Sequence, residues 1–136
     1  MRALDETTFV AGQIWPEDVA GAAAEGVTMI VNNRPDREEP GQPEGAEIEA
    51  AARAAGMEYR FVPVSSGISE AQIAAMADAL EAADGKVLAY CRSGTRSTML
   101  WALARARLGE KGESLAEKAA AAGYDLAPIR GFLDRA

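Results

Sequence analysis

Residues 87–97 read Val-Leu-Ala-Tyr-Cys-Arg-Ser-Gly-Thr-Arg-Ser, and this stretch decides the fold that we expect. The apolar run 87–90 predicts a short buried strand, and residues 95–108 predict a helix. The loop between them begins at Cys91, which the pattern therefore places among backbone N–H groups at the positive end of a helix dipole. Both features favour the thiolate, the reactive form of cysteine. The stretch predicts a site that holds an anion beside a nucleophile.

Residue types that are missing from the chain narrow the possible chemistry. The 136 residues include one cysteine and no histidine. A Ser-His-Asp triad, a Cys-His pair and a His-ligated metal site are therefore excluded, and so is an internal disulfide. We expect neither a metal nor a cofactor. Cys91 could be only a small buried hydrophobic residue, but the glycine, hydroxyl residues and two arginines that follow it favour a functional role.

The overall charge limits the partners. With 14 basic and 21 acidic residues, the net charge is −7 and the isoelectric point is near 4.6, which argues against nucleic acid and anionic membranes as partners. No apolar stretch approaches the roughly 20 residues of a membrane span, and residues 1–6 lack the pattern of a secretory signal. A free reactive thiol fits a reducing compartment. We expect a single cytoplasmic domain over residues 1–136.

Strands and helices alternate along the sequence. Apolar and β-branched runs predict strands over 7–11, 27–31, 59–64 and 87–90, and the intervening patterns predict helices over 16–25, 44–55, 69–83, 95–108, 114–122 and 127–135. Ser69 and Gln72 form a capping-box signature. This order predicts an α/β fold in three layers, with a mainly parallel sheet flanked by helices. Loops 32–36, 65–67 and 91–97 then converge at the carboxyl edge of the sheet, where ligands bind.

Several stretches resemble one bacterial family. They are residues 9–13 (Phe-Val-Ala-Gly-Gln), 31–36 (Val-Asn-Asn-Arg-Pro-Asp), 62–64 (Val-Pro-Val), 90–97 and 122–126 (Ala-Gly-Tyr-Asp-Leu). Through them the chain resembles the phosphatase-like domain associated with beta-lactamase-hydrolase-like proteins. The resemblance implies a dual-specificity-phosphatase-like fold, and members of the family are described either as phosphatases or as sulfurtransferases.

The sequence departs from the phosphatase pattern at three points. Tyr90 stands where those enzymes have histidine, and four residues rather than five separate the cysteine from Arg96. The aspartic acid that serves as general acid would fall near Ser65 and Ser66, and neither is acidic. The short Cys-Arg-Ser-Gly-x-Arg loop is the one that rhodaneses use. Sulfur transfer through a cysteine persulfide needs a stabilised thiolate but no positioned acid.

Matching positions imply the following roles. Cys91 is the nucleophile, Arg96 is the anion clamp, and Ser97 resembles the hydroxyl that hydrogen-bonds the thiolate or the leaving sulfur. The backbone amides of the intervening loop form the anion cradle, with the Arg92 side chain directed outward; these residues are Arg92, Ser93, Gly94 and Thr95. Gly94 permits a positive φ or a close approach.

Arg34 and Asp36 allow two interpretations. In the functional one, Arg34 adds charge to the anion site and Asp36 supplies an acid from a different loop, which would restore phosphatase chemistry. In the structural one, both belong to a polar loop, and Asp36 is a turn or cap residue after Pro35.

Our leading hypothesis from the sequence is a sulfurtransferase that moves sulfane sulfur through a Cys91 persulfide. The first alternative is a Cys-dependent phosphatase that acts through a phosphocysteine, and the second is a non-catalytic oxyanion-binding module. The expected partners are a small anionic substrate (thiosulfate, a persulfide or a phosphoester) and a thiol acceptor.

Overall fold

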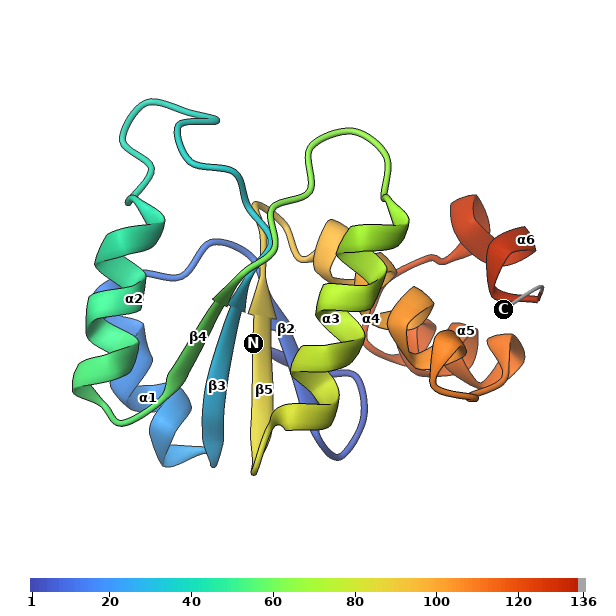
Figure 1. Cartoon of the computed structure of the whole chain (residues 1–136), viewed down its shortest axis with the longest axis horizontal. Coiled ribbons are helices and arrows are strands. Elements are labelled where there is room, and N and C mark those ends of the chain that lie inside the picture. The colour runs from blue at the N-terminus through green and yellow to red at the C-terminus, as the bar shows by residue number, and fades with distance from the viewer. Residues whose placement is uncertain (135–136) are drawn as a thin grey trace.

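The chain folds as a sheet between two layers of helices (Figure 1). A computed structural model of the protein describes residues 1–134. The sheet has the order β1-β2-β5-β3-β4, and its strands are β1 (Arg2–Ala3), β2 (Thr8–Ala11), β3 (Val27–Asn32), β4 (Glu58–Phe61) and β5 (Lys86–Tyr90). Only β1 runs antiparallel to its neighbour among these strands. The predicted α/β architecture with a mainly parallel sheet is confirmed. β1 was not predicted, because two residues carry no periodicity.

The helices divide between the two faces of the sheet. One face carries α1 (Val19–Ala24), which follows the 3-10 turn η1 (Pro16–Asp18), and α2 (Gly45–Ala54). The other face carries α3 (Glu70–Ala82), α4 (Thr95–Arg107), α5 (Gly112–Ala121) and α6 (Arg130–Leu133), the last after the 3-10 turn η2 (Ala127–Ile129) (Figure 1). The last helix was expected to reach residue 135, which lies outside the described residues. Within residues 1–134, no helix has the length and apolarity that crossing a membrane requires.

Alternating side chains of the central strands build one apolar core on each face. Met29 and Val31 of β3 belong to the core beneath α3 and α4, whereas Ile30 belongs to the core beneath α1 and α2. Trp101 of α4 is fully buried. All of β5 after its first residue is buried as well, as expected for a central parallel strand that is covered on both faces. The carboxyl end of β5 is therefore a rigid base for the loop that follows it.

The loop before α3 is tied to that helix by the predicted capping box. Ser69 Oγ accepts a hydrogen bond from the backbone N–H of Gln72 at 3.2 Å, and Gln72 Oε1 accepts one from the backbone N–H of Ser69 at 2.7 Å. The same Gln72 side chain donates to the Pro63 carbonyl at 2.8 Å. Residues 62–69 are thus fixed at both ends, next to the carboxyl edge of the sheet.

Candidate active site

Cys91 lies at the junction of β5 and α4. The residue is fully buried, and the Gly94 amide donates a hydrogen bond to its Sγ at 3.1 Å. Gly94 is the N-cap of α4 and has a φ of 91°, a left-handed conformation that favours glycine. The first N–H groups of any helix lack partners within the helix. The sulfur therefore lies beside an amide-rich, electropositive helix terminus.

Two neighbouring segments, residues 11–13 and the stretch around Tyr124, hold the backbone of the Cys91 loop. The Cys91 amide donates to the Ala11 carbonyl at 3.3 Å, and the Gln13 amide donates to the Arg92 carbonyl at 3.2 Å. From the C-terminal part of the chain, Tyr124 Oη donates to the Ser93 carbonyl at 3.2 Å. The sequence pointed to these segments only through a family resemblance, and the contacts give them a physical role in fixing the loop.

Arg96 joins the Cys91 loop to the two neighbouring loops. Its Nη1 donates to the Val64 carbonyl at 2.6 Å, and its two Nη atoms bind both carboxylate oxygens of Glu38 at 2.7 and 2.9 Å. The pKa of Arg96 is raised chiefly by its hydrogen bond to Glu38 and in smaller part by Cys91. The predicted convergence of three loops at this edge of the sheet is confirmed.

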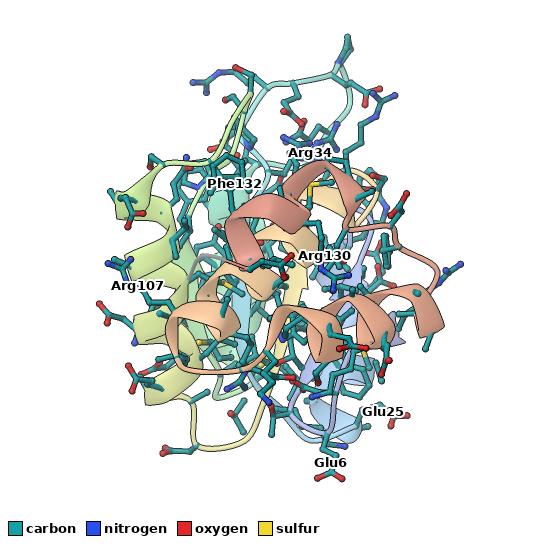
Figure 2. All side chains as sticks on the ribbon, turned by 90° about the vertical axis from the view of Figure 1, so that its right-hand side faces the viewer. Glu6, Glu25, Arg34, Arg107, Arg130 and Phe132 are labelled. Carbon is teal, nitrogen blue, oxygen red and sulfur yellow. The ribbon has the colours of Figure 1, made fainter. Side chains whose placement is uncertain are left out.

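Arg34 lies in the same network, and its side chain is 5% exposed. Its Nε binds Glu38 at 2.9 Å, its Nη2 binds Glu39 at 2.8 Å, and its Nη1 donates to Gln13 Oε1 at 3.0 Å. Figure 2 shows Arg34 beneath the loop at the top of the molecule.

The Arg92 side chain is 66% exposed and pairs with Glu39 at 2.7 Å. Arg92 therefore points outward, as predicted.

Glu38 and Glu39 together make an acidic pair that binds three arginines, Arg34, Arg92 and Arg96. Hydrogen bonds from Arg96 and Arg34 outweigh partial burial and lower the pKa of Glu38 from 4.5 to about 2. Glu38 is therefore ionised at neutral pH, and an oxyanion that binds the Arg96 fork must displace it. Nothing in the sequence marks this pair, because acidic residues are common throughout the chain.

Ser97 does not make the hydrogen bond that the resemblance implied. The Asn33 amide nitrogen donates to the Val62 carbonyl at 2.9 Å, so Asn33 Oδ1 is the acceptor for the Ser97 hydroxyl at 2.8 Å. A hydroxyl has one proton. In this arrangement Ser97 donates to Asn33 and not to the Cys91 thiolate. Both side chains are fully buried, and they connect α4 to the end of β3.

Asp36 makes the contact expected of a capping residue. Its Oδ1 accepts a hydrogen bond from the amide of Gly45, the first residue of α2, at 2.7 Å. A role for Asp36 as an acid remains a prediction.

Ser65 and Ser66, which stand where the general acid of the phosphatases would fall, are both exposed. Burial raises the pKa of Tyr90, the residue in the histidine position of the phosphatase motif, so its phenol stays neutral. Within residues 1–134, no group of three or more acidic or cysteine side chains could hold a metal ion.

The mainly parallel sheet, with a buried cysteine at the end of its central strand and a helix after the loop, is a phosphatase-like α/β fold. The family model "Beta-lactamase hydrolase-like protein, phosphatase-like domain" matches residues 1–108, and the chain belongs to this family. The family resemblance and the phosphatase-like fold that we expected from the sequence are thus confirmed.

Relatives in both sequence and structure share this fold. A beta-lactamase hydrolase-like protein of Agrobacterium fabrum is 39% identical over 97% of this chain, and the match covers 31% of that protein. A beta-lactamase hydrolase-like protein of Xylella fastidiosa is 40% identical over 99% of this chain, and the match covers 32% of that protein. The chain therefore spans about a third of the length of these curated relatives. A candidate phosphatase of Neisseria meningitidis Z2491 is 34% identical, with a TM-score of 0.84 over 98% of this chain and 96% of that one.

A more distant structural neighbour is P. aeruginosa TpbA in complex with pTyr. It is 18% identical, with a TM-score of 0.61 over 97% of this chain and 88% of that one, and it shows the fold alone. The family model and the Neisseria meningitidis structure support the phosphatase alternative better than the sulfurtransferase hypothesis, which they do not confirm.

Replacing Gly94 by alanine should destabilise the protein and disorder the Cys91 loop. A Cβ atom at Gly94 would collide with the Tyr124 ring, and the backbone conformation disfavours any L side chain. We expect a loss of about 1–3 kcal/mol in the free energy of unfolding, measured by urea denaturation. Gly21→Ala is the matched control, because Gly21 lies within α1 with open space around it and alanine favours a helix. Equal stability of the two variants would contradict this prediction.

Glu38→Gln should strengthen oxyanion binding, because the variant removes the carboxylate that occupies the Arg96 fork. We expect phosphate to bind about tenfold more tightly, as measured by isothermal titration calorimetry. The control is Glu49→Gln, which neutralises an exposed ion pair with Arg53 on α2. An unchanged or weaker affinity in Glu38→Gln would show that Glu38 does not compete with the anion.

The stability of the wild-type protein should depend on the ionisation of Glu38. The pKa of Glu38 is about 2 in the folded protein against 4.5 ordinarily, so ionised Glu38 stabilises the folded state. This contribution to the free energy of unfolding is fully present above pH 4.5 and is lost as the pH falls toward 2. The difference in unfolding free energy between wild type and Glu38→Gln should therefore shrink between about pH 6 and pH 3. Urea denaturation at both values measures it, and a constant difference would rule out this linkage.

Proposed function

We propose that this domain is a Cys-dependent phosphatase that hydrolyses aryl phosphate esters through a phosphocysteine at Cys91. The observation that carries the proposal is the position of the Cys91 sulfur, hydrogen-bonded by the Gly94 amide at the N-terminus of α4, in a loop that also supplies the Arg96 fork. The family and the structural neighbours support the same class of reaction.

The first half of the reaction transfers the phosphoryl group to sulfur. The Cys91 thiolate attacks phosphorus, the P–O ester bond breaks, and the ester oxygen leaves with the bonding electron pair as a phenolate, which then takes a proton from solvent. Arg96 replaces its contacts to Glu38 with contacts to the phosphoryl oxygens, and the loop amides bind the remaining charge. A water molecule then attacks phosphorus, the S–P bond breaks, and phosphate leaves while the thiolate is regenerated.

The side chains around Cys91 favour a leaving group that needs little protonation. Glu38 is ionised at neutral pH because its pKa is about 2, and the Asp36 carboxylate is held by the Gly45 amide. A phenolate departs far more easily than an alkoxide when no acid is in place. Aryl phosphates are thus the better substrate class. The complex of P. aeruginosa TpbA with pTyr, an aryl phosphate, is in line with this choice.

Sulfur transfer is the second candidate function, and one specific observation favours it. The loop has four residues between Cys91 and Arg96, as in rhodaneses, and no protonated acid is needed. The thiolate would attack the sulfane sulfur of thiosulfate, sulfite would leave with the electron pair of the S–S bond, and the Cys91 persulfide would pass its outer sulfur to a thiol acceptor. The same anion site would bind thiosulfate.

Parallel assays of the purified protein distinguish the two reactions. We expect phosphate release from 4-nitrophenyl phosphate and from a phosphotyrosine peptide, with much slower release from an alkyl phosphate and little thiocyanate from thiosulfate and cyanide. Cys91→Ser should abolish the release from both aryl substrates, since serine lacks the thiolate. Rapid thiocyanate formation without hydrolysis of the phosphotyrosine peptide would decide for the sulfurtransferase.

Arg96→Lys should lower kcat on aryl phosphates by about 10²–10³-fold, because a lysine point charge cannot bind two oxygens in the plane of a fork. Steady-state kinetics with 4-nitrophenyl phosphate measures the loss. Arg53→Lys is the control, because Arg53 makes an exposed i,i+4 ion pair with Glu49 on α2. Comparable activity of the two variants would remove Arg96 from the proposed site.

A further inference from the structure

A groove of about 910 Å³ adjoins the anion site, and Arg96 and Val64 belong to its lining. Aliphatic side chains make up half of the remaining lining residues; they are Ile68, Ile73, Met99, Leu103 and Ile129. The volume falls within the range of small-molecule binding sites, about 300–1,000 Å³. The groove is therefore large enough for the organic part of a ligand whose anionic group is bound at Arg96.

The groove follows one face of α4. Arg96, Met99, Leu103 and Arg107 all line it and recur at helical spacing, so they form a single row about 16 Å long at a rise of 1.5 Å per residue. The Arg96 fork lies at one end of the row. At the other end, Arg107 pairs with Glu70 at 3.2 Å. Figure 2 faces this side of the molecule and labels Arg107 and Phe132, which also belong to the lining.

The chemistry along the row changes from anion-binding to apolar and ends at an ion pair. Arg96 binds two oxygens of Glu38, and the next positions on the same face, Met99 and Leu103, offer only apolar surface. Met99 and Ile73 are partly buried, so part of this surface is open to a ligand. A molecule that satisfies the whole row has a negatively charged head and an elongated aliphatic part.

We propose that the groove binds an aliphatic substituent of the substrate, so that the domain selects amphiphilic aryl phosphates with the phosphate at Arg96 and the chain along Met99 and Leu103. This inference rests on the proposed phosphatase function. The row of apolar side chains on α4 ends at the exposed ion pair of Arg107 and Glu70, so a chain that extends past this pair gains no further apolar contact along the helix.

A series of 4-alkylphenyl phosphates tests the proposal, since the basicity of the phenolate hardly changes with the chain. The assays use substrate concentrations below those at which micelles form. We expect kcat/KM to rise two- to fourfold with each added methylene and to level off once the alkyl chain reaches Arg107. Met99→Gln and Ile68→Ser should flatten this rise. Trp15→Gln is the control, because Trp15 is an exposed apolar residue next to η1, outside the groove lining, and should leave the rise intact. A kcat/KM independent of chain length in the wild type would overturn the proposal.

Binding measurements separate this proposal from the proposed function. Titration calorimetry of Cys91→Ser with 4-alkylphenylphosphonates, which cannot be hydrolysed, should show the same gain per methylene. If affinity rises with each methylene but the wild-type protein hydrolyses no phosphate ester, the groove binds the alkyl chain and the proposed phosphatase function is refuted. A neutral 4-alkylphenol that bound as tightly as the phosphonate would contradict the link between groove and anion site. Tighter binding of a phosphotyrosine peptide with polar flanks than of the long-chain phosphonate would also overturn the proposal.

Discussion

The Arg96 guanidinium is the group on which the arrangement of the site depends. It belongs to the first turn of α4, binds the Val64 carbonyl of the loop before α3, and forms a two-point ion pair with Glu38 of the loop after β3. Three chain segments that are far apart in sequence are thus held by one planar fork. Such a fork has several donors in fixed directions, so it fixes the relative positions of these three segments.

The same network shapes the electrostatics of the site. In a chain of net charge −7, the three arginines around the Cys91 loop are paired with only two carboxylates, so this cluster keeps one positive charge. In the mechanism that we propose, an incoming anion replaces the Glu38 carboxylate at the Arg96 fork. This exchange favours dianions with several oxygens over simple carboxylates, because they can bind the guanidinium and the loop amides together.

Much of the fold and the centre of the site could be predicted from the sequence. Residues 87–97 indicated the strand, the loop and the helix, and the Ser69–Gln72 pair marked the start of α3. Partners that depend on tertiary contact could not be predicted. Glu38 lies 58 positions from Arg96, and nothing local marks it. Ser97 was expected to face the thiolate, but the amide orientation of Asn33 redirects its hydroxyl. The groove along α4 arises only when α3 and the C-terminal helices pack against it.

The central claim is that Cys91 carries a phosphoryl group during turnover. Rapid mixing of the protein with an aryl phosphate, acid quenching within the first turnover and peptide mass spectrometry would locate the covalent group. We expect a phosphate on the peptide that contains Cys91, formed and lost at rates consistent with turnover. Hydrolysis without any phosphate on Cys91, or a Cys91 persulfide after mixing with thiosulfate as the sole covalent species found, would contradict it.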